Sequence, residues 1–193
     1  MGTPLPNYSY AFTRVLVLFA VLVGAFNSHA LAEDADAPLL VYVTVGVLDI
    51  DEINSAEQRF TANYFALFRW LDPALAHDGP ETIRRNIGDI KAPRFLLLNQ
   101  QRTWSSLLNV VDIKPSGEVV FRQRLWGDFS QPLRLHDFPF DTHTFELPMV
   151  SFGDLDQEVI LMPDPERESI IADNLSVADW RILGYKAELR DIK

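Results

Sequence analysis

Residues 131–152, QPLRLHDFPFDTHTFELPMVSF, form the stretch that decides the fold. Phe138, Pro139, Phe140 and Asp141 lie at its centre, so two aromatic rings flank a proline and a carboxylate follows. Pro139 fixes its own φ and drives the preceding residue toward extended geometry, which predicts a turn. We expect rings at the tip of a turn to press against a core edge, a partner or a membrane-side surface. A buried β-turn with a proline corner explains the same residues.

The composition is that of an ordinary globular protein. The 193 residues are 48% hydrophobic and 23% charged, which suits a single domain with a sizeable core. The absence of cysteine excludes a disulfide frame, a thiolate metal site and a cysteine nucleophile. With 17 basic and 27 acidic residues the net charge is −10. That charge argues against nucleic acid and anionic lipids as partners and favours cations or amines. No sequence pattern indicates a cofactor.

The first 32 residues are typical of an export signal. Arg14 precedes an apolar run over residues 15–26, which is too short to cross a bilayer. Ala30 and Ala32 then form a small-x-small cleavage pattern. We therefore expect a signal peptide over residues 1–32 and a mature domain over residues 33–193, exported to the periplasm or the extracellular face of the membrane. An uncleaved anchor is the alternative.

Alternating and aromatic-rich segments predict an all-β chain. Turn signals separate them, among them an acidic turn over residues 49–55 and the Pro-Ser-Gly turn before Glu118. Short strands without helical periodicity favour a β-sandwich. The expected strands cover residues 39–50, 59–71, 105–113, 118–129, 143–150, 158–162 and 180–191.

The Phe-Pro-Phe-Asp motif resembles the signature loop of the pentameric ligand-gated ion channels, which are the Cys-loop receptors and their bacterial relatives. In that family two half-cystines flank the motif, at the positions of Gln131 and Phe145 in this sequence. Neither position is a cysteine, as in the bacterial members. The resemblance covers about residues 39–191 and implies an immunoglobulin-like sandwich of the Cys-loop receptor ectodomain type, with its last strand missing.

Two further segments match motifs of this family. Trp70 and Asp72 match the Trp-x-Asp that ends the second strand, where the indole packs in the core. Residues 91–99, KAPRFLLLN, match a Trp-x-Pro-Asp-x-x-x-Tyr-Asn segment, of which only Pro93 and Asn99 remain. The resemblance assigns structural roles to these four single residues. An ordinary core position explains Trp70 equally well.

The resemblance also implies a ligand site between neighbouring subunits. Phe65 stands where the complementary face offers an aromatic ring, Leu98 replaces a ring of the principal face, and Phe152 is the next candidate of that face. Rings hold amines by cation–π attraction of about 0.5–2 kcal/mol each. Because Leu98 has no π face, we expect weak binding of a small amine, with added attraction from carboxylates over residues 164–173. Core packing explains each phenylalanine as well.

Two polar clusters have competing explanations. His136, Asp137, Asp141 and His143 surround the turn, but their spacing matches no zinc frame. They suit proton sensing, or they are ordinary surface residues. Residues 49–52 lack the spacing of a calcium loop and are explained by a solvated acidic turn. With no nucleophile elbow either, we expect neither a metal site nor an enzyme.

These features predict the extracellular ligand-binding domain of a bacterial pentameric channel, homopentameric in its full-length form. The resemblance implies that the turn over residues 53–58 and the tip formed by Phe138, Pro139, Phe140 and Asp141 couple ligand binding to pore gating. The family continues with a capping loop, a last strand and four membrane helices, so we expect the pore domain to be missing from this chain. One alternative is a free secreted or periplasmic small-molecule-binding protein of this fold. The other is a sandwich glycoside hydrolase or lectin.

Overall fold

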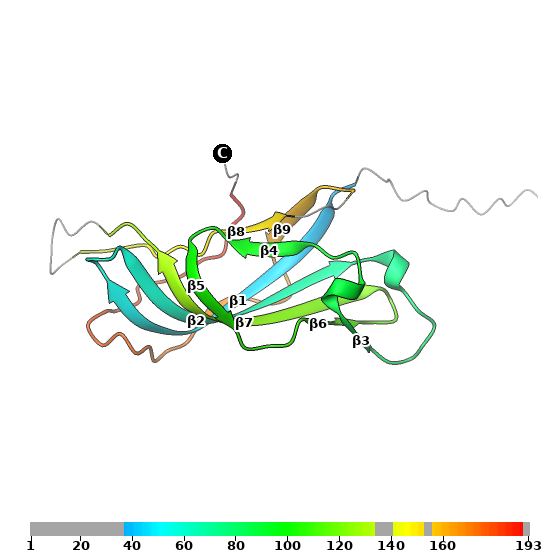
Figure 1. Ribbon diagram of the computed structural model, residues 1–193, viewed down its shortest axis with the longest axis horizontal. Helices are drawn as coiled ribbons and strands as arrows, with labels where there is room; N and C mark the ends of the chain where they lie inside the picture. The colour runs from blue at the N-terminus through cyan, green and yellow to red at the C-terminus, as the bar shows by residue number, and fades with distance from the viewer. Residues whose placement is uncertain (1–36, 134–140, 153–155, 191–193) are drawn as a thin grey trace, which may run out of the picture. The chain divides into compact units, whose positions relative to one another are not determined.

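A computed structural model describes residues 37–133, 141–152 and 156–190 (Figure 1). In these ranges the chain forms ten strands and two short 3-10 helices, and none of its helices is long and apolar enough to cross a membrane. The strands are β1 (Leu39–Asn54), β2 (Arg59–Leu71), β3 (Ile83–Asn86), β4 (Arg94–Leu97), β5 (Gln100–Ser105), β6 (Val110–Ile113), β7 (Glu118–Ser130), β8 (Met149–Phe152), β9 (Val159–Pro163) and β10 (Ile170–Ile171). The 3-10 helices are η1 (Pro73–Leu75) and η2 (Ile87–Asp89).

Eight of the described strands form one large sheet, and the other two form a small one. The large sheet has the order β10-β1-β2-β7-β6-β3, with β5 also paired to β7 and β9 also paired to β1. The small sheet is the antiparallel pair of β4 and β8, which lie side by side in Figure 1. Strand β2 pairs with β7 along its whole length, from Arg59 to Leu71. It is therefore the central strand on which the positions of the site residues depend.

The core lies between the small sheet and one face of the large sheet. Alternation along β2 places Tyr64, Ala66, Phe68 and Trp70 on this inward face, and none of them is more than 3% exposed. Phe95 of β4 stacks on Phe68 with ring centroids 3.8 Å apart. The two sheets thus bury their apolar faces against each other, and the predicted all-β fold class is confirmed.

Three of the predicted strands agree closely with the structure. The strand expected over residues 59–71 matches β2 at both ends. The strands expected over residues 118–129 and 158–162 lie within one residue of β7 and β9 at each end. These segments combine apolar alternation with neighbouring strands that satisfy their backbone groups, so pattern and pairing agree.

The predicted acidic turn over residues 49–55 is wrong. Strand β1 continues to Asn54, so Asp49 and the next carboxylates lie on the strand, and the turn occupies residues 55–58. Two irregularities in the pairing with β2 interrupt the register on either side of Ile50. Such β-bulges let a strand carry extra residues without ending, which the polarity of a segment does not reveal.

Three other strand predictions need correction. The strand expected over residues 105–113 is split, because β5 ends at Ser105 and β6 begins only at Val110. Residues 141–148 belong to no strand, and strand β8 starts at Met149. Residues 180–190 form no strand, and residues 181–190 are exposed. Alternation alone does not make a strand where the described residues offer no ladder partner.

Candidate ligand-binding and coupling sites

The face of β2 that points away from the small sheet carries Phe65. It lies directly opposite Gly46 of β1 and Arg124 of β7. The Arg124 Nε donates to Asn63 Oδ1 at 3.2 Å, which holds this cation on the same face. Phe65 is partly buried, and it belongs to none of the ring pairs in the described part of the chain. Within the described part of the chain the ring therefore has a cationic neighbour and no aromatic partner.

Leu98 and Phe152 lie at opposite ends of the small sheet. The Leu98 N–H donates to the Pro148 carbonyl at 2.9 Å, and the side chain is 50% exposed. Phe152 is the last residue of β8, pairs with Arg94 and is 49% exposed. Four ladder positions separate them, or about 13 Å along a strand. The structure thus leaves both side chains accessible but does not place them side by side.

Each of the two phenylalanines has an arginine as its cross-strand neighbour. Arg124 is opposite Phe65, and Arg94, which is exposed, is opposite Phe152. Directly opposite residues of an antiparallel pair project to the same face with Cβ atoms about 5 Å apart. A guanidinium attracts a carboxylate and repels an ammonium group. Both rings therefore lie in surroundings that favour a ligand with an anionic group.

Trp70, Asp72 and Pro93 are all engaged in local packing or capping. Trp70 is 2% exposed and packs in the core. The Asp72 carboxylate accepts the Ala74 N–H at 3.0 Å and so caps η1. Pro93 is fully buried immediately before β4. These contacts position the loop that leads into the small sheet.

Side-chain amides hold the base of the stretch over residues 131–152. Asn99 Nδ2 donates to the Ser130 carbonyl at 3.1 Å and to the Glu146 carbonyl at 2.8 Å. The Gln131 Oε1 accepts the Glu146 N–H at 3.2 Å. In the family that the motif resembles, the first half-cystine stands at the position of Gln131. The second half-cystine stands directly before the position of Glu146. Hydrogen bonds thus close the loop next to the place of the absent disulfide.

The turn between β1 and β2 is bonded to the same stretch through Gln58. Its amide accepts the Leu133 N–H at 2.7 Å and donates to the Leu133 carbonyl at 3.1 Å. Its backbone carbonyl accepts the Gln131 N–H at 2.8 Å. Gln58 has a φ of 54°, which is uncommon outside glycine and is stabilised here by these three bonds. The two loops that the resemblance assigns to coupling are therefore joined at their bases.

The tip itself falls largely outside the described residues. Phe138, Pro139 and Phe140 are among those not described, as are His136 and Asp137. Asp141 is partly buried. His143, also partly buried, has its ring 5.7 Å from the Trp180 ring. In the described ranges no group of three or more His, Cys, Asp or Glu side chains could hold a metal ion.

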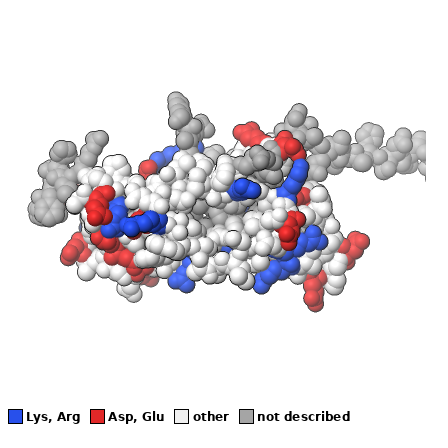
Figure 2. Space-filling model, viewed as in Figure 1, with Lys and Arg blue, Asp and Glu red and all other residues white. Residues whose placement is uncertain are grey.

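Arg59 at the start of β2 lies close to three carboxylates, beside the turn over residues 55–58. Its guanidinium lies 2.5 Å from Glu57, 3.2 Å from Asp128 and 3.3 Å from Glu52. Burial raises the pKa of the Asp128 carboxyl, but the Thr61 hydroxyl and two arginines outweigh it and hold that pKa below its ordinary value. The Asp128 carboxylate is thus held by two arginines and a hydroxyl. Figure 2 shows Lys and Arg side chains beside Asp and Glu side chains at each end of this face, with mostly uncharged surface between the two ends.

Arg69, near the other end of β2, binds a buried carboxylate. Its Nη2 lies 2.8 Å from Asp164 Oδ1, and the Asp164 side chain has no exposed surface. Burial raises the pKa of Asp164, but the hydrogen bonds from Arg69, the Glu166 N–H and Arg167 outweigh it and lower that pKa. The expectation that the carboxylates of this loop attract a cationic ligand is therefore wrong for Asp164, because internal arginines neutralise it.

Sequence comparison now decides the family. Residues 17–189 match the sequence model of the neurotransmitter-gated ion-channel ligand binding domain. The chain belongs to this family. It is also 24% identical over 164 residues to the gamma-aminobutyric acid receptor subunit alpha-4 of Rattus norvegicus, a match that covers 79% of this chain and 29% of that protein. The chain therefore spans less than a third of the length of this curated relative.

Membership in the ligand-binding domain family bears on several of the predictions. The family binds small ligands as the extracellular-facing part of membrane channels, and it is not a family of enzymes. The glycoside hydrolase alternative is therefore excluded, and the prediction that the chain is not an enzyme is confirmed. The predicted Cys-loop receptor resemblance is confirmed at the level of the family, in a chain without cysteine.

Sequence reasoning missed the two arginines and the amide that organise the neurotransmitter-gated ligand-binding domain locally. Arg94 stands where the family segment has Asp. Motif matching counts this position only as a mismatch, although the reversed charge is itself a signal that the site differs. Arg124 is found only by aligning β7 with β2. Gln58 carries no sequence signal at all, because its contacts join loops 75 residues apart.

Proposed function

We propose that the chain is the extracellular ligand-binding domain of a bacterial pentameric ligand-gated channel, and that it binds its ligand between neighbouring subunits. One observation carries this proposal. Phe65 points away from the small sheet, whereas Phe152 belongs to the small sheet, so the large sheet lies between them. A pocket that includes both rings needs two copies of the chain, one for each face.

The ligand that suits both faces is a small zwitterion. The rings of Phe65 and Phe152 attract an ammonium group through their π faces, and the neighbouring Arg124 and Arg94 attract a carboxylate. The relative from rat is named as a receptor for gamma-aminobutyric acid, which carries both groups. A simple amine satisfies only the rings. Protons are the other predicted ligand. Of the two histidines in the predicted cluster, His143 is the one that lies in the described part of the chain.

Coupling to the pore is proposed to run through the joined loops. Gln58 connects the turn over residues 55–58 to Gln131 and Leu133, at the base of the tip stretch. A shift of one loop therefore moves the other. The rings of Phe138 and Phe140 would dock on the pore domain of the full-length homopentamer, at the periplasmic or extracellular face of the membrane.

Calorimetric titration with gamma-aminobutyric acid and with ethylamine tests the ligand assignment. We expect gamma-aminobutyric acid to bind more tightly, because only it engages the arginines. Arg94→Gln should remove this preference, while Arg85→Gln on the exposed β3 should not. Equal affinities for gamma-aminobutyric acid and ethylamine in the wild type and in both variants would refute the zwitterion site.

Ultracentrifugation tests the assembly that this site requires. We expect a monomer or a weak ring of five, because head-to-tail contacts between the two faces close into a ring. A tight closed dimer would contradict the ring. A downstream reading frame with four apolar segments of about 20 residues would identify the channel, and its absence would favour the free binding protein.

A further inference from the structure

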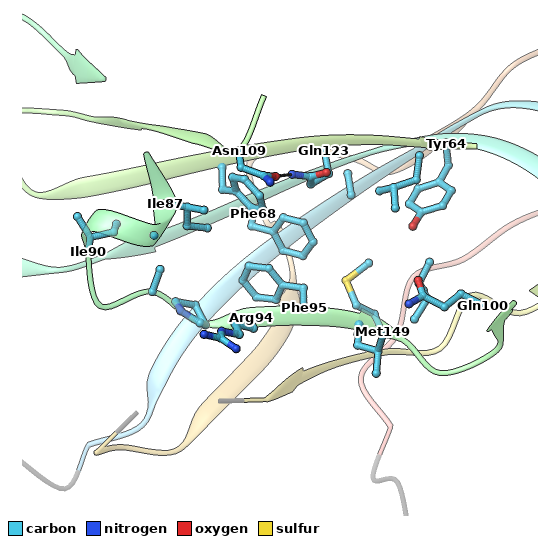
Figure 3. Close-up of a pocket in the computed structure, with 18 of the residues that line it drawn as sticks. Tyr64, Phe68, Ile87, Ile90, Arg94, Phe95, Gln100, Asn109, Gln123 and Met149 are labelled. Atoms are coloured by element: carbon cyan, nitrogen blue, oxygen red, sulfur yellow. Dashed lines mark hydrogen bonds between the residues drawn. The ribbon is translucent and has the colours of Figure 1, made fainter. Parts of the chain in front are cut away.

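A cavity of about 500 Å³ lies between the inward face of the large sheet and the small sheet (Figure 3). Small-molecule sites commonly have volumes of about 300–1,000 Å³. Strands β2 and β7 form one wall, and β4 with its preceding loop and Met149 of β8 form the other. Neither Phe65, Leu98 nor Phe152 lines it, and of the residues in the proposed site between subunits it shares only the exposed Arg94.

One part of the wall is a stack of aromatic rings. Phe95 lies 3.8 Å from Phe68, with 8° between the ring planes, and 6.4 Å from Phe121, with 25° between them. Figure 3 shows Phe68 and Phe95 face to face in the middle of the cavity lining, with Met149 beside them. Stacked rings and a thioether suit a flat apolar molecule, which gains dispersion and ring contacts from them.

The hydroxyl of Tyr64 points into this space. Tyr64 is 2% exposed, and Figure 3 shows its hydroxyl directed from β2 toward the side where Met149 and Gln100 lie. Among the described residues none forms a hydrogen bond with this hydroxyl, so a ligand in the cavity can bond to it without displacing a protein partner. Burial raises the pKa of Tyr64, so the group stays a neutral phenol that can donate or accept.

The other polar side chains of the lining are the Gln100 amide, a pair of bonded amides and two exposed cations. The amides of Asn109 and Gln123 bond to each other at 3.0 Å, and Figure 3 shows this pair above the phenylalanine stack, away from the Tyr64 hydroxyl. Lys91 and Arg94 line the cavity but are exposed, so water screens their charges. A ligand inside meets rings, methyl groups, the Tyr64 hydroxyl and the Gln100 amide, and these groups require no charge on it.

We propose that this cavity is a second binding site, for a small neutral aromatic molecule that carries one hydroxyl or carbonyl group. The ring of the ligand would lie against the Phe68–Phe95 stack, and its polar group would bond to the Tyr64 hydroxyl. The site is complete within one chain. It does not depend on assembly or on the ligand that binds between subunits.

Fluorine NMR with para-fluorobenzyl alcohol and para-fluorotoluene tests this proposal on the whole chain. We expect saturable binding of both probes at one site. Tyr64→Phe removes only the hydroxyl, so it should weaken the alcohol about fivefold, the factor given by one hydrogen bond, and leave the toluene within about twofold. Ala66→Phe fills the lining from β2 and should abolish binding of both probes.

Two controls keep the outcome clear. Phe152→Ala should change neither probe affinity, because that ring lies outside the cavity, whatever it does to a ligand between subunits. Circular dichroism and an unfolding curve should show that Tyr64→Phe is folded. Absence of saturable binding to the wild-type chain, or an equal loss for both probes in Tyr64→Phe, would overturn the proposal.

Discussion

The two faces of strand β2 hold their aromatic side chains in different ways. On the inward face Phe68 and Trp70 are 3% and 2% exposed, and both contact the ring of Phe95. On the outward face Phe65 lies between the ion-paired Arg59 and Arg69 and has no ring partner among the described residues. Packing within one chain explains the inward rings fully. It leaves the outward ring available, so alternation along one strand separates the residues that fold the domain from one that can bind.

The largest expected effect is on the inward face. Phe68→Ala should lower the free energy of unfolding by about 3–5 kcal/mol, because it removes a stacked ring and leaves a cavity. Phe65→Ala should cost about 1 kcal/mol or less, as substitutions of partly exposed side chains usually do. Urea unfolding of both variants measures this difference. Equal losses would mean that Phe65 is a core residue and that the two faces do not differ.

The next largest effect concerns the ion pair of the outward face. Asp164→Asn should cost about 3 kcal/mol, because it leaves Arg69 without its buried partner. Asp156→Asn is the matched control, since its pair with Lys91 is exposed and should not matter. Urea unfolding at neutral pH compares the two, and a loss no greater in Asp164→Asn than in the control would show that packing holds this face as well.

The same carboxylate predicts a pH dependence. The folded pKa of Asp164 lies below its ordinary value, so the unfolded chain takes up its proton first as the pH falls. The contribution of Asp164 to the free energy of unfolding is fully present above about pH 5. It is lost progressively below about pH 4, which is the pKa of the carboxyl in the unfolded chain. Unfolding curves should converge for wild type and Asp164→Asn at acid pH. A constant gap across this range would contradict the pairing.

A smaller effect is expected at Phe152, which we propose to contact the ligand between subunits. Phe152→Ala should weaken binding about tenfold, which corresponds to one cation–π contact of about 1.4 kcal/mol. Calorimetry with gamma-aminobutyric acid measures it, and Leu183→Ala, also exposed, is the control. Unchanged affinity would return Phe152 to a packing role and remove it from the site.

The smallest expected effect is at the tip. If Phe138 and Phe140 serve to dock on a pore domain, changing both to Ser should alter the free energy of unfolding by only about 0.5 kcal/mol. Phe145→Ser is the contrast, because that ring packs edge-on against Phe60 at 5.1 Å and should cost about 3 kcal/mol. A loss of several kcal/mol in the double variant would make the tip a structural corner.

The sequence predicted the central strands well, because their apolar alternation reports directly on burial. It failed where long-range partners decide the structure. Residues 141–148 alternate, yet the Asn99 side chain takes the carbonyl of Glu146 in place of a neighbouring strand. Residues 49–54 look like a turn, yet bulges carry them along β1.

The candidate site was predictable in its aromatic positions and not in its charge. Phe65 and Phe152 follow from family motifs, whereas Arg124 becomes a neighbour of Phe65 only through the register of β2 and β7. The cavity could not be predicted from the sequence either. Tyr64 and Phe95 are far apart in sequence, and each is a plausible core residue alone. Pairing across sheets creates both features.

Complementation between two variants tests the shared site most directly. Phe65→Ala impairs one face and Phe152→Ala the other, so each alone should weaken binding of gamma-aminobutyric acid at every interface. In a ring assembled from an equal mixture, about one quarter of the interfaces unite two intact faces. Calorimetry at a concentration where rings form should therefore show about one quarter of the sites with wild-type affinity. A mixture that binds no better than the separate variants would contradict a site shared between subunits.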